Sequence, residues 1–327
     1  MSVVRERVVA RVSLAAIGAN FEAIRARAQA EMPLFQGAVP MVKCNAYGHG
    51  LLEVGRALEK KRAALALGVA ALAEGERLRA GGARKPIWVF SDTSPWDDAV
   101  AARARRANLT PVIHTLDDLR RLLARPRAAP RAFHLKFNTG MNRLGIEATD
   151  ALKAKRLLEA AGLAPEGICT HFACADEPSR PITRAQVEIF RAIAALFHED
   201  VSHIHCSNTS ASLSARRLGL SDFCDVIRPG IGLYGYSDVA TARLKPALRL
   251  SARVVSSRML EVGDSVGYGG TYRAAARGPQ CILAIGYGDG LMRRLSNATV
   301  RIGGRGVRVL GRVSMDLTAL ALRAKPG

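Results

Sequence analysis

The sequence predicts an α/β protein, a (β/α)8 TIM barrel followed by a mostly antiparallel β domain. Eight short apolar runs alternate with longer helical patterns over about 230 residues, the size of a barrel of eight strand–helix units. After about residue 240 the chain becomes β-rich and punctuated by glycine, as in "DSVGYGGTY" and "CILAIGYGDG". A doubly wound open sheet is the alternative for the first part.

The first expected element is a helix over residues 14–28, because Leu14, Ile17, Phe21 and Ile24 fall on one helical face. Helical patterns such as residues 51–61 then separate most of the apolar runs. The eight expected strands are residues 39–43, 64–70, 86–90, 110–114, 132–137, 166–172, 202–207 and 224–230.

The change of texture places the domain boundary between residues 237 and 238. The barrel then spans residues 8–237 and the β domain residues 238–327, with residues 1–7 as candidates for pairing onto the β domain. The chain stops at "RAKPG", where a turn signal points onward. We therefore expect the β domain to be C-terminally truncated, which would leave an unpaired strand edge.

Composition narrows the classes of protein that fit. The net charge is +20, but the basic residues are spread along expected helices and aromatic residues make up 5%, so specific nucleic-acid binding is disfavoured. No apolar run approaches the length of a membrane span. The six cysteines form no CxxC pair, which is typical of reduced thiols in a cytoplasmic protein.

Polar residues gather where the expected strands end. The carboxyl ends of barrel strands meet at one rim, which is where barrel enzymes place their chemistry. Their convergence predicts a functional site at this rim. The residues are Lys43 after the first run, Lys136 in the fifth, His171 in the sixth, Asn208 and Thr209 after the seventh and Arg228 in the eighth.

The last two rim loops suit a phosphate. "SNTSAS" (207–212) and "RPGIG" (228–232) supply hydroxyls, glycines and helix N-termini, whose N–H groups favour an anion. A rim lysine facing a phosphate cradle suggests pyridoxal phosphate held as a Schiff base. A site-lysine aldolase acting on a sugar phosphate fits the same two facts. His203 and His205 invite a metal interpretation, but no third ligand lies at a sensible spacing, so no metal is expected.

Eight motifs resemble those of the alanine racemase family, in the family's order, from about residue 8 to 320. They are "VPMVKCNAYGHG", "LKFNTGMNRLG", "THFACAD", "SNTSAS", "RPGIGLYG", "VGYGGTY", "IGYGDG" and "GRVSMD". The resemblance implies a homodimer dependent on pyridoxal 5'-phosphate that interconverts L- and D-alanine for peptidoglycan synthesis or D-alanine catabolism. A racemase of broader specificity, or a truncated chain that binds cofactor without full turnover, are the alternatives.

The resemblance also implies roles for single residues. Lys43 would hold the cofactor and act as one acid–base group, and Tyr268 would be the second, reaching the partner subunit's site. Arg143 and the backbone of Met315 would bind the substrate carboxylate. The remaining cofactor contacts would be Tyr47, Asn208, Thr209, Gly230 and Ile231 on the phosphate side, Arg228 at the pyridine nitrogen and His171 as an orienting group, with Lys136, Tyr287 and Asp316 in support.

Three positions bear on how far the resemblance holds. Thr209 stands where many members have serine, so a hydroxyl is kept. Asn138 stands where many have aspartate, so a charge near Arg143 is lost. Lys136 occupies the place of a lysine that is carbamylated in some members.

Overall fold

A computed structural model describes residues 6–92, 94, 96–125, 130–239 and 242–322. By their internal contacts the residues divide into two compact units. One runs from Val12 to Ala247, and the other combines the residues up to Arg11 with those from Leu248 onward. None of the helices in the described ranges is both long and apolar enough to cross a membrane.

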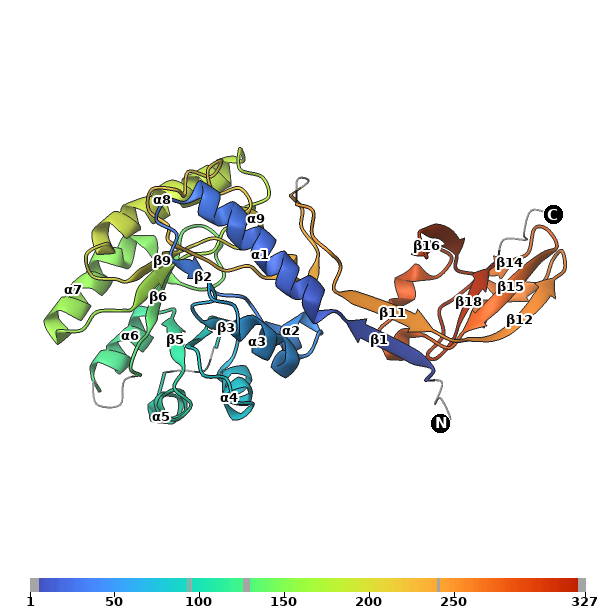
Figure 1. The fold of residues 1–327 in the computed structure, drawn as a ribbon, viewed down its shortest axis with the longest axis horizontal. Coiled ribbons are helices and arrows are strands. Elements are labelled where there is room, and N and C mark those ends of the chain that lie inside the picture. The colour runs from blue at the N-terminus through green and yellow to red at the C-terminus, as the bar shows by residue number, and fades with distance from the viewer. Residues whose placement is uncertain (1–5, 93, 95, 126–129, 240–241, 323–327) are drawn as a thin grey trace. The chain divides into compact units, whose positions relative to one another are not determined.

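The first unit is the predicted barrel (Figure 1). Its strands pair in parallel in the order β3-β4-β5-β6-β8-β9 and β10-β2. Isolated parallel bridges, Met41 with Gly68 and Ser207 with Ile227, join these two sets and close the ring. The strands are β2 (Gly37–Ala38), β3 (Leu67–Val69), β4 (Ile87–Val89), β5 (Thr110–Ile113), β6 (His134–Asn138), β8 (Gly167–Cys169), β9 (His203–His205) and β10 (Val226–Ile227), with the short β7 (Ile146–Glu147) beside β6.

The first strand differs from its expected extent. β2 ends at Ala38, and only a single bridge at Met41 continues it, whereas the sequence predicted a strand through Lys43. Pro40 has no N–H to donate to a ladder, which interrupts the regular pairing there. Lys43 therefore does not end a strand but begins the next element, α2 (Lys43–Tyr47).

Helices cover the outside of the ring. α1 (Leu14–Glu31) begins at Ser13, whose hydroxyl accepts the Ala16 N–H at 3.1 Å, and buries Ile17, Phe21 and Ile24 as predicted. Leu14 is 40% exposed, because it lies in the first turn at the edge of the buried face. The others are α3 (Leu51–Glu59), α4 (Leu72–Ala80), α5 (Asp98–Arg106), α6 (Leu116–Leu123), α7 (Ala151–Ala161), α8 (Pro181–Phe197) and α9 (Thr209–Ser212), with 3-10 turns η1 (Ala148–Asp150) and η2 (Ile231–Tyr234).

Successive strand residues enter two different cores. In β4, Ile87 and Val89 belong to the large cluster shared with the helices, and Trp88 between them belongs to a separate cluster with Met41, Phe90 and other strand residues. This alternation is what a barrel requires, because neighbouring side chains of a strand point to opposite faces. The barrel interior is therefore filled by side chains.

The second unit is an antiparallel β domain, as predicted. β1 (Val8–Val12) pairs with β11 (Leu248–Ala252), and β15 (Gly278–Leu283) lies between β12 (Val254–Leu260) and β18 (Thr318–Ala321). Its helical elements in the described ranges are the 3-10 turns η3 (Tyr268–Gly270), η4 (Tyr287–Asp289) and η5 (Arg293–Leu295). Two hairpins complete it, β13 (Ser265–Val266) with β14 (Tyr272–Arg273), and β16 (Thr299–Ile302) with β17 (Arg305–Arg308).

Candidate active site

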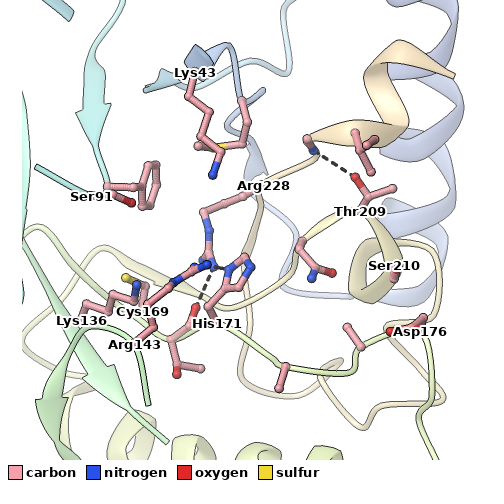
Figure 2. A pocket seen from close by; sticks show the side chains of 18 of the residues that line it. Lys43, Ser91, Lys136, Arg143, Cys169, His171, Asp176, Thr209, Ser210 and Arg228 are labelled. Carbon is pink, nitrogen blue, oxygen red and sulfur yellow. Dashed lines mark hydrogen bonds between the residues drawn. The ribbon is translucent and has the colours of Figure 1, made fainter. Parts of the chain in front are cut away.

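A cavity of about 260 Å³ opens at the carboxyl ends of the barrel strands (Figure 2). Strands distant in sequence each bring one or two polar side chains to it, because parallel strands all end at the same rim. Ten residues singled out from the sequence line it: Lys43, Tyr47, Lys136, Arg143, His171, Asn208, Thr209, Arg228, Gly230 and Ile231.

Lys43 is presented by an unusual turn. The four residues after it, Cys44 to Tyr47, have φ between 53° and 55°, so they form a turn of left-handed helix. Each non-glycine residue in this conformation costs about 1–2 kcal/mol. Glu74 offsets part of this cost, because its Oε1 accepts the Cys44 N–H at 2.5 Å. The backbone after Lys43 is thereby fixed.

The environment of Lys43 favours its neutral amine. Burial lowers the pKa of Lys43 below its ordinary value, and the positive charge of Arg143 lowers it further. In Figure 2 the Lys43 side chain extends into the cavity toward Arg228. A neutral amine is the form that attacks a carbonyl, so Lys43 is suited to nucleophilic chemistry.

The opposite wall has the form of an anion cradle. The Thr209 hydroxyl accepts the N–H groups of Gly230 at 3.0 Å and Gly232 at 3.1 Å, which draws the two last rim loops together. A Cβ atom at Gly230 would lie 2.6 Å from the Tyr47 hydroxyl, so only glycine allows this approach. The hydroxyls of Tyr47 and Thr209 therefore lie together at this wall of the cavity, where Gly230 contributes no side chain.

Arg228 lines the cavity and is held there by hydrogen bonds from both of its terminal nitrogens. Its Nη1 donates to the His205 carbonyl at 2.5 Å and to His205 Nδ1 at 2.7 Å. Its Nη2 donates to the Thr170 carbonyl at 2.7 Å and makes a longer contact of 3.4 Å to His171 Nδ1. Burial, reinforced by Arg228, holds the pKa of His171 well below its ordinary value, so its ring is neutral.

Lys136 and Arg143 add positive charge to the same space. Burial lowers the pKa of Lys136 to about 8, with further lowering from Arg228, Arg143 and Lys43. Asn138 fixes the loop that carries Arg143: its Oδ1 accepts the Asn142 N–H at 3.0 Å, and its Nδ2 donates to Glu147 at 3.1 Å. Four basic side chains, those of Lys43, Lys136, Arg143 and Arg228, line one cavity, which suits a ligand with more than one negative charge.

Four of the residues named from the sequence belong to the β domain: Tyr268, Tyr287, Met315 and Asp316. Tyr268 is 70% exposed on η3. The Tyr287 and Gly288 N–H groups donate to the carbonyls of Ser314 and Met315, so these segments lie together. Arg7 adds to this cluster by donating to the Asp316 carbonyl at 3.0 Å and to Asp289 at 2.6 Å. The roles of these four residues stay predictions.

Sequence reasoning missed several residues of the site. Ser91 and Asp176 line the cavity, and Glu74 supports the Lys43 turn. Glu74 carried a weak signal, a glutamate in the first turn of an expected helix, which is a capping position. His205 was considered only as a metal ligand, but it contacts Arg228. Among the described residues no group of three or more histidines, cysteines or carboxylates is arranged to hold a metal ion.

A (β/α)8 barrel whose rim presents a buried lysine amine of lowered pKa opposite an anion cradle defines a class of enzyme that works through a site lysine. Comparison with known proteins gives the family. Residues 12–238 match the model of the alanine racemase N-terminal domain, and residues 247–327 match that of the C-terminal domain. The chain belongs to the alanine racemase family, as its motifs indicated.

Individual relatives agree with this assignment. The chain is 37% identical to the alanine racemase of Halorhodospira halophila over 96% of its own length and 84% of the relative, and 35% identical to that of Carboxydothermus hydrogenoformans over 97% and 87%. Among solved structures, the alanine racemase of Streptomyces lavendulae matches with a TM-score of 0.85 at 30% identity, covering 98% of this chain and 85% of that one. The biosynthetic enzyme of Pseudomonas aeruginosa matches with 0.83 at 34%, covering 98% and 87%.

Proposed function

We propose that this chain interconverts L- and D-alanine with pyridoxal 5'-phosphate carried on Lys43. The reaction would serve either peptidoglycan synthesis, as a source of D-alanine, or the catabolism of D-alanine. The observation that carries the proposal is that the Lys43 amine and the Thr209–Gly230 cradle open onto one cavity. When bound, the cofactor would serve as the electron sink that makes the Cα proton of alanine acidic.

The residues present fit this cofactor. The aldehyde of the cofactor needs an amine, which Lys43 supplies. The phosphate needs hydroxyls and positive charge; Tyr47 and Thr209 supply the hydroxyls, and the basic side chains that line the cavity supply the charge. The space left by the missing side chain of Gly230 lies beside the Tyr47 hydroxyl. Asn208 caps α9 through the Ala211 N–H at 3.0 Å and so steadies this wall, and Ile231 continues it.

Racemisation sets a geometric demand on the protein. A proton must leave Cα from one face and another must be delivered to the opposite face, since a single base tends to restore the original configuration. Lys43 Nζ would hold or release the proton on one face, because burial and Arg143 bring its pKa down toward the working range. The Tyr268 hydroxyl would do so on the other face.

The remaining site residues bind and orient. Arg143, helped by the Met315 backbone, would hold the substrate carboxylate. Arg228 would face the pyridine nitrogen as a hydrogen-bond donor, because a guanidinium carries only N–H donors and no acceptor. His171 would orient Arg228 as a neutral ring, Lys136 would add positive charge, and Asp316, Tyr287 and their backbone contacts would position Met315.

We further propose that the working form is a homodimer in the cytoplasm, with Tyr268 contributed to the partner subunit's site. The exposure of Tyr268 and of other apolar residues of the β domain, such as Val254, Val262 and Leu317, supports a second copy that covers part of this domain. All six cysteines are free thiols, which fits a reducing compartment.

Borohydride trapping tests the cofactor link. Full-length protein incubated with pyridoxal phosphate, reduced with borohydride and digested should carry the added mass on the peptide that contains Lys43, and Lys43→Arg should not. A second arm follows L-alanine in deuterated water, where we expect deuterium at Cα together with D-alanine. A label on another lysine, or no D-alanine from the loaded protein, would overturn the proposal.

A further inference from the structure

A line of hydrogen bonds crosses the barrel interior from Arg228 to Glu166. Arg228 Nη1 lies 2.7 Å from His205 Nδ1, and His205 Nε2 lies 2.8 Å from His134 Nδ1. His134 Nε2 in turn lies 3.2 Å from Glu166 Oε2. His205 lies in β9 and His134 in β6, whereas Arg228 directly follows β10 and Glu166 directly precedes β8. The line therefore runs from the carboxyl end of one strand to the amino end of another.

The direction of every bond in the line is fixed by the two ends. A guanidinium only donates, so His205 Nδ1 must accept and the ring proton of His205 must sit on Nε2. His134 Nδ1 then accepts a hydrogen bond from the His205 Nε2–H group, and His134 carries its own proton on Nε2. A carboxylate only accepts, so Glu166 is the one partner that completes the line without conflict.

The surroundings bury both imidazoles and keep them neutral. His134 and His205 are fully buried, and burial lowers the pKa of each ring below its ordinary value. The contact of His134 with Glu166 is therefore a hydrogen bond from a neutral ring to a carboxylate and not an ion pair. The Trp88 ring packs against both, with centroid distances of 4.1 Å to His134 and 5.0 Å to His205.

The backbone is adapted to the line as well. A Cβ atom at Gly167 would lie 2.6 Å from His134 Nδ1, the atom that accepts from His205. Because glycine has no side chain, the His134 ring can approach the backbone here and contact the His205 ring. The Glu166 side chain is 32% exposed, so the line ends at solvent and its last member can be changed without opening the core.

We propose that Glu166 is a positioning residue for Arg228: its carboxylate is the acceptor that, together with the donor-only guanidinium at the other end, sets the tautomers of His134 and His205 and so holds the guanidinium at the rim. Without this acceptor His134 can move its proton to Nδ1. His205 Nε2 must then accept, and its Nδ1 becomes a donor that faces another donor on Arg228. Arg228 would lose one of its fixed contacts and the orientation that depends on it.

The tautomers can be measured directly. In the full chain labelled with 15N-histidine, two-bond 15N–1H correlation spectra distinguish rings protonated on Nε2 from those protonated on Nδ1. Wild-type protein should show His134 and His205 as neutral Nε2–H rings, assigned with His134→Gln and His205→Gln. Glu166→Leu should shift one or both rings to Nδ1–H, whereas Glu166→Gln, which keeps an accepting oxygen, should not.

Glu159→Leu, the same change at an exposed position of α7, is the matched control and should leave both rings unchanged. A wild-type Nδ1–H ring at either position, or unchanged tautomers in Glu166→Leu, would overturn the proposal. This arm needs no cofactor, so it decides the direction of the line even if the protein proves not to be a racemase.

The consequence for the reaction rests on the proposed function and has its own readout. We expect Glu166→Leu to lower the kcat of racemisation about ten- to a hundredfold, as when a group near the reacting atoms is misplaced, with KM for alanine little changed. Glu166→Gln should restore kcat to within about twofold. An equal loss of kcat in both variants, or no loss in Glu166→Leu, would exclude the positioning role.

Discussion

The carboxylate of Glu74 accepts the backbone N–H of Cys44 at 2.5 Å and so holds the turn that begins at Lys43. Its other oxygen accepts the Ala70 N–H at 2.8 Å and the Ala71 N–H at 3.3 Å, at the start of α4. One side chain thus joins the strained left-handed turn to the end of β3 and the helix that follows. Both carboxylate oxygens are needed for this link, because one accepts from Cys44 in the turn and the other accepts from Ala70 and Ala71.

Glu74→Gln should therefore weaken the site more than its small change in size suggests. The amide keeps one acceptor but turns an N–H2 group toward backbone donors, so one of the two attachments fails. We expect a loss of about 1–3 kcal/mol in the free energy of unfolding, measured by urea denaturation, and weaker binding of pyridoxal phosphate. Glu53→Gln, at an exposed position of α3, is the control. Equal cofactor affinity in all three proteins would show that Glu74 does not support Lys43.

Lys136→Met should stabilise the protein in a way that depends on pH. The pKa of Lys136 is lowered from 10.5 to about 8, so the folded protein pays for the buried ammonium below pH 8. This cost shrinks as pH rises from about 8 to 10.5, where the lysine of the unfolded chain also loses its proton. Methionine removes a cost of up to about 3 kcal/mol at pH 7 and little at pH 10.5. Urea unfolding of both proteins at the two pH values measures this; the same difference at both would contradict it.

Asp225 should make the barrel less stable as pH rises. Burial raises its pKa from 3.8 to about 7, so between these values the folded state binds the proton that the unfolded chain has released. Stability from this group is complete below about pH 4 and falls until about pH 7. Asp225→Asn keeps the acceptor for the Ile204 N–H, which Asp225 Oδ1 binds at 2.9 Å. We expect the variant to lose this pH dependence. In denaturant titrations its free energy of unfolding should therefore rise relative to that of wild type from pH 4.5 to pH 7, and the difference should be constant above pH 7. A parallel pH profile for the two proteins would refute the assignment.

Mixing two inactive variants should restore activity if Tyr268 works across the dimer. A heterodimer of Lys43→Ala and Tyr268→Phe chains holds one site with an intact Lys43 and the partner's intact Tyr268, while each homodimer holds none. Random exchange of equal amounts gives half heterodimers with one working site each, or about a quarter of wild-type activity. Racemisation measured by circular dichroism after exchange tests this. No recovery, with exchange verified by a mass tag, would place both residues in the same chain.

Much of the barrel could be predicted because its signal is local. All eight strands lie within or beside the apolar runs, and Ile17, Phe21 and Ile24 of α1 are buried as their spacing indicated. The rim residues could be predicted as well, since a barrel brings every strand end to one edge. The error at the first strand had two causes. Pro40 interrupts the ladder, and the turn after Lys43 is left-handed, a conformation that the residue types in this turn do not predict.

The sequence by itself determined the family, the order of the strands and the set of side chains that meet at the rim, because these depend on local pattern and on motifs kept in order. The tertiary structure decided how those side chains are held. Glu74 and Glu166 reach their partners only when segments far apart in the chain are packed together, and the tautomers of His134 and His205 follow from which donors and acceptors face each other. Such pairings are properties of distance and direction, which a one-dimensional pattern does not contain.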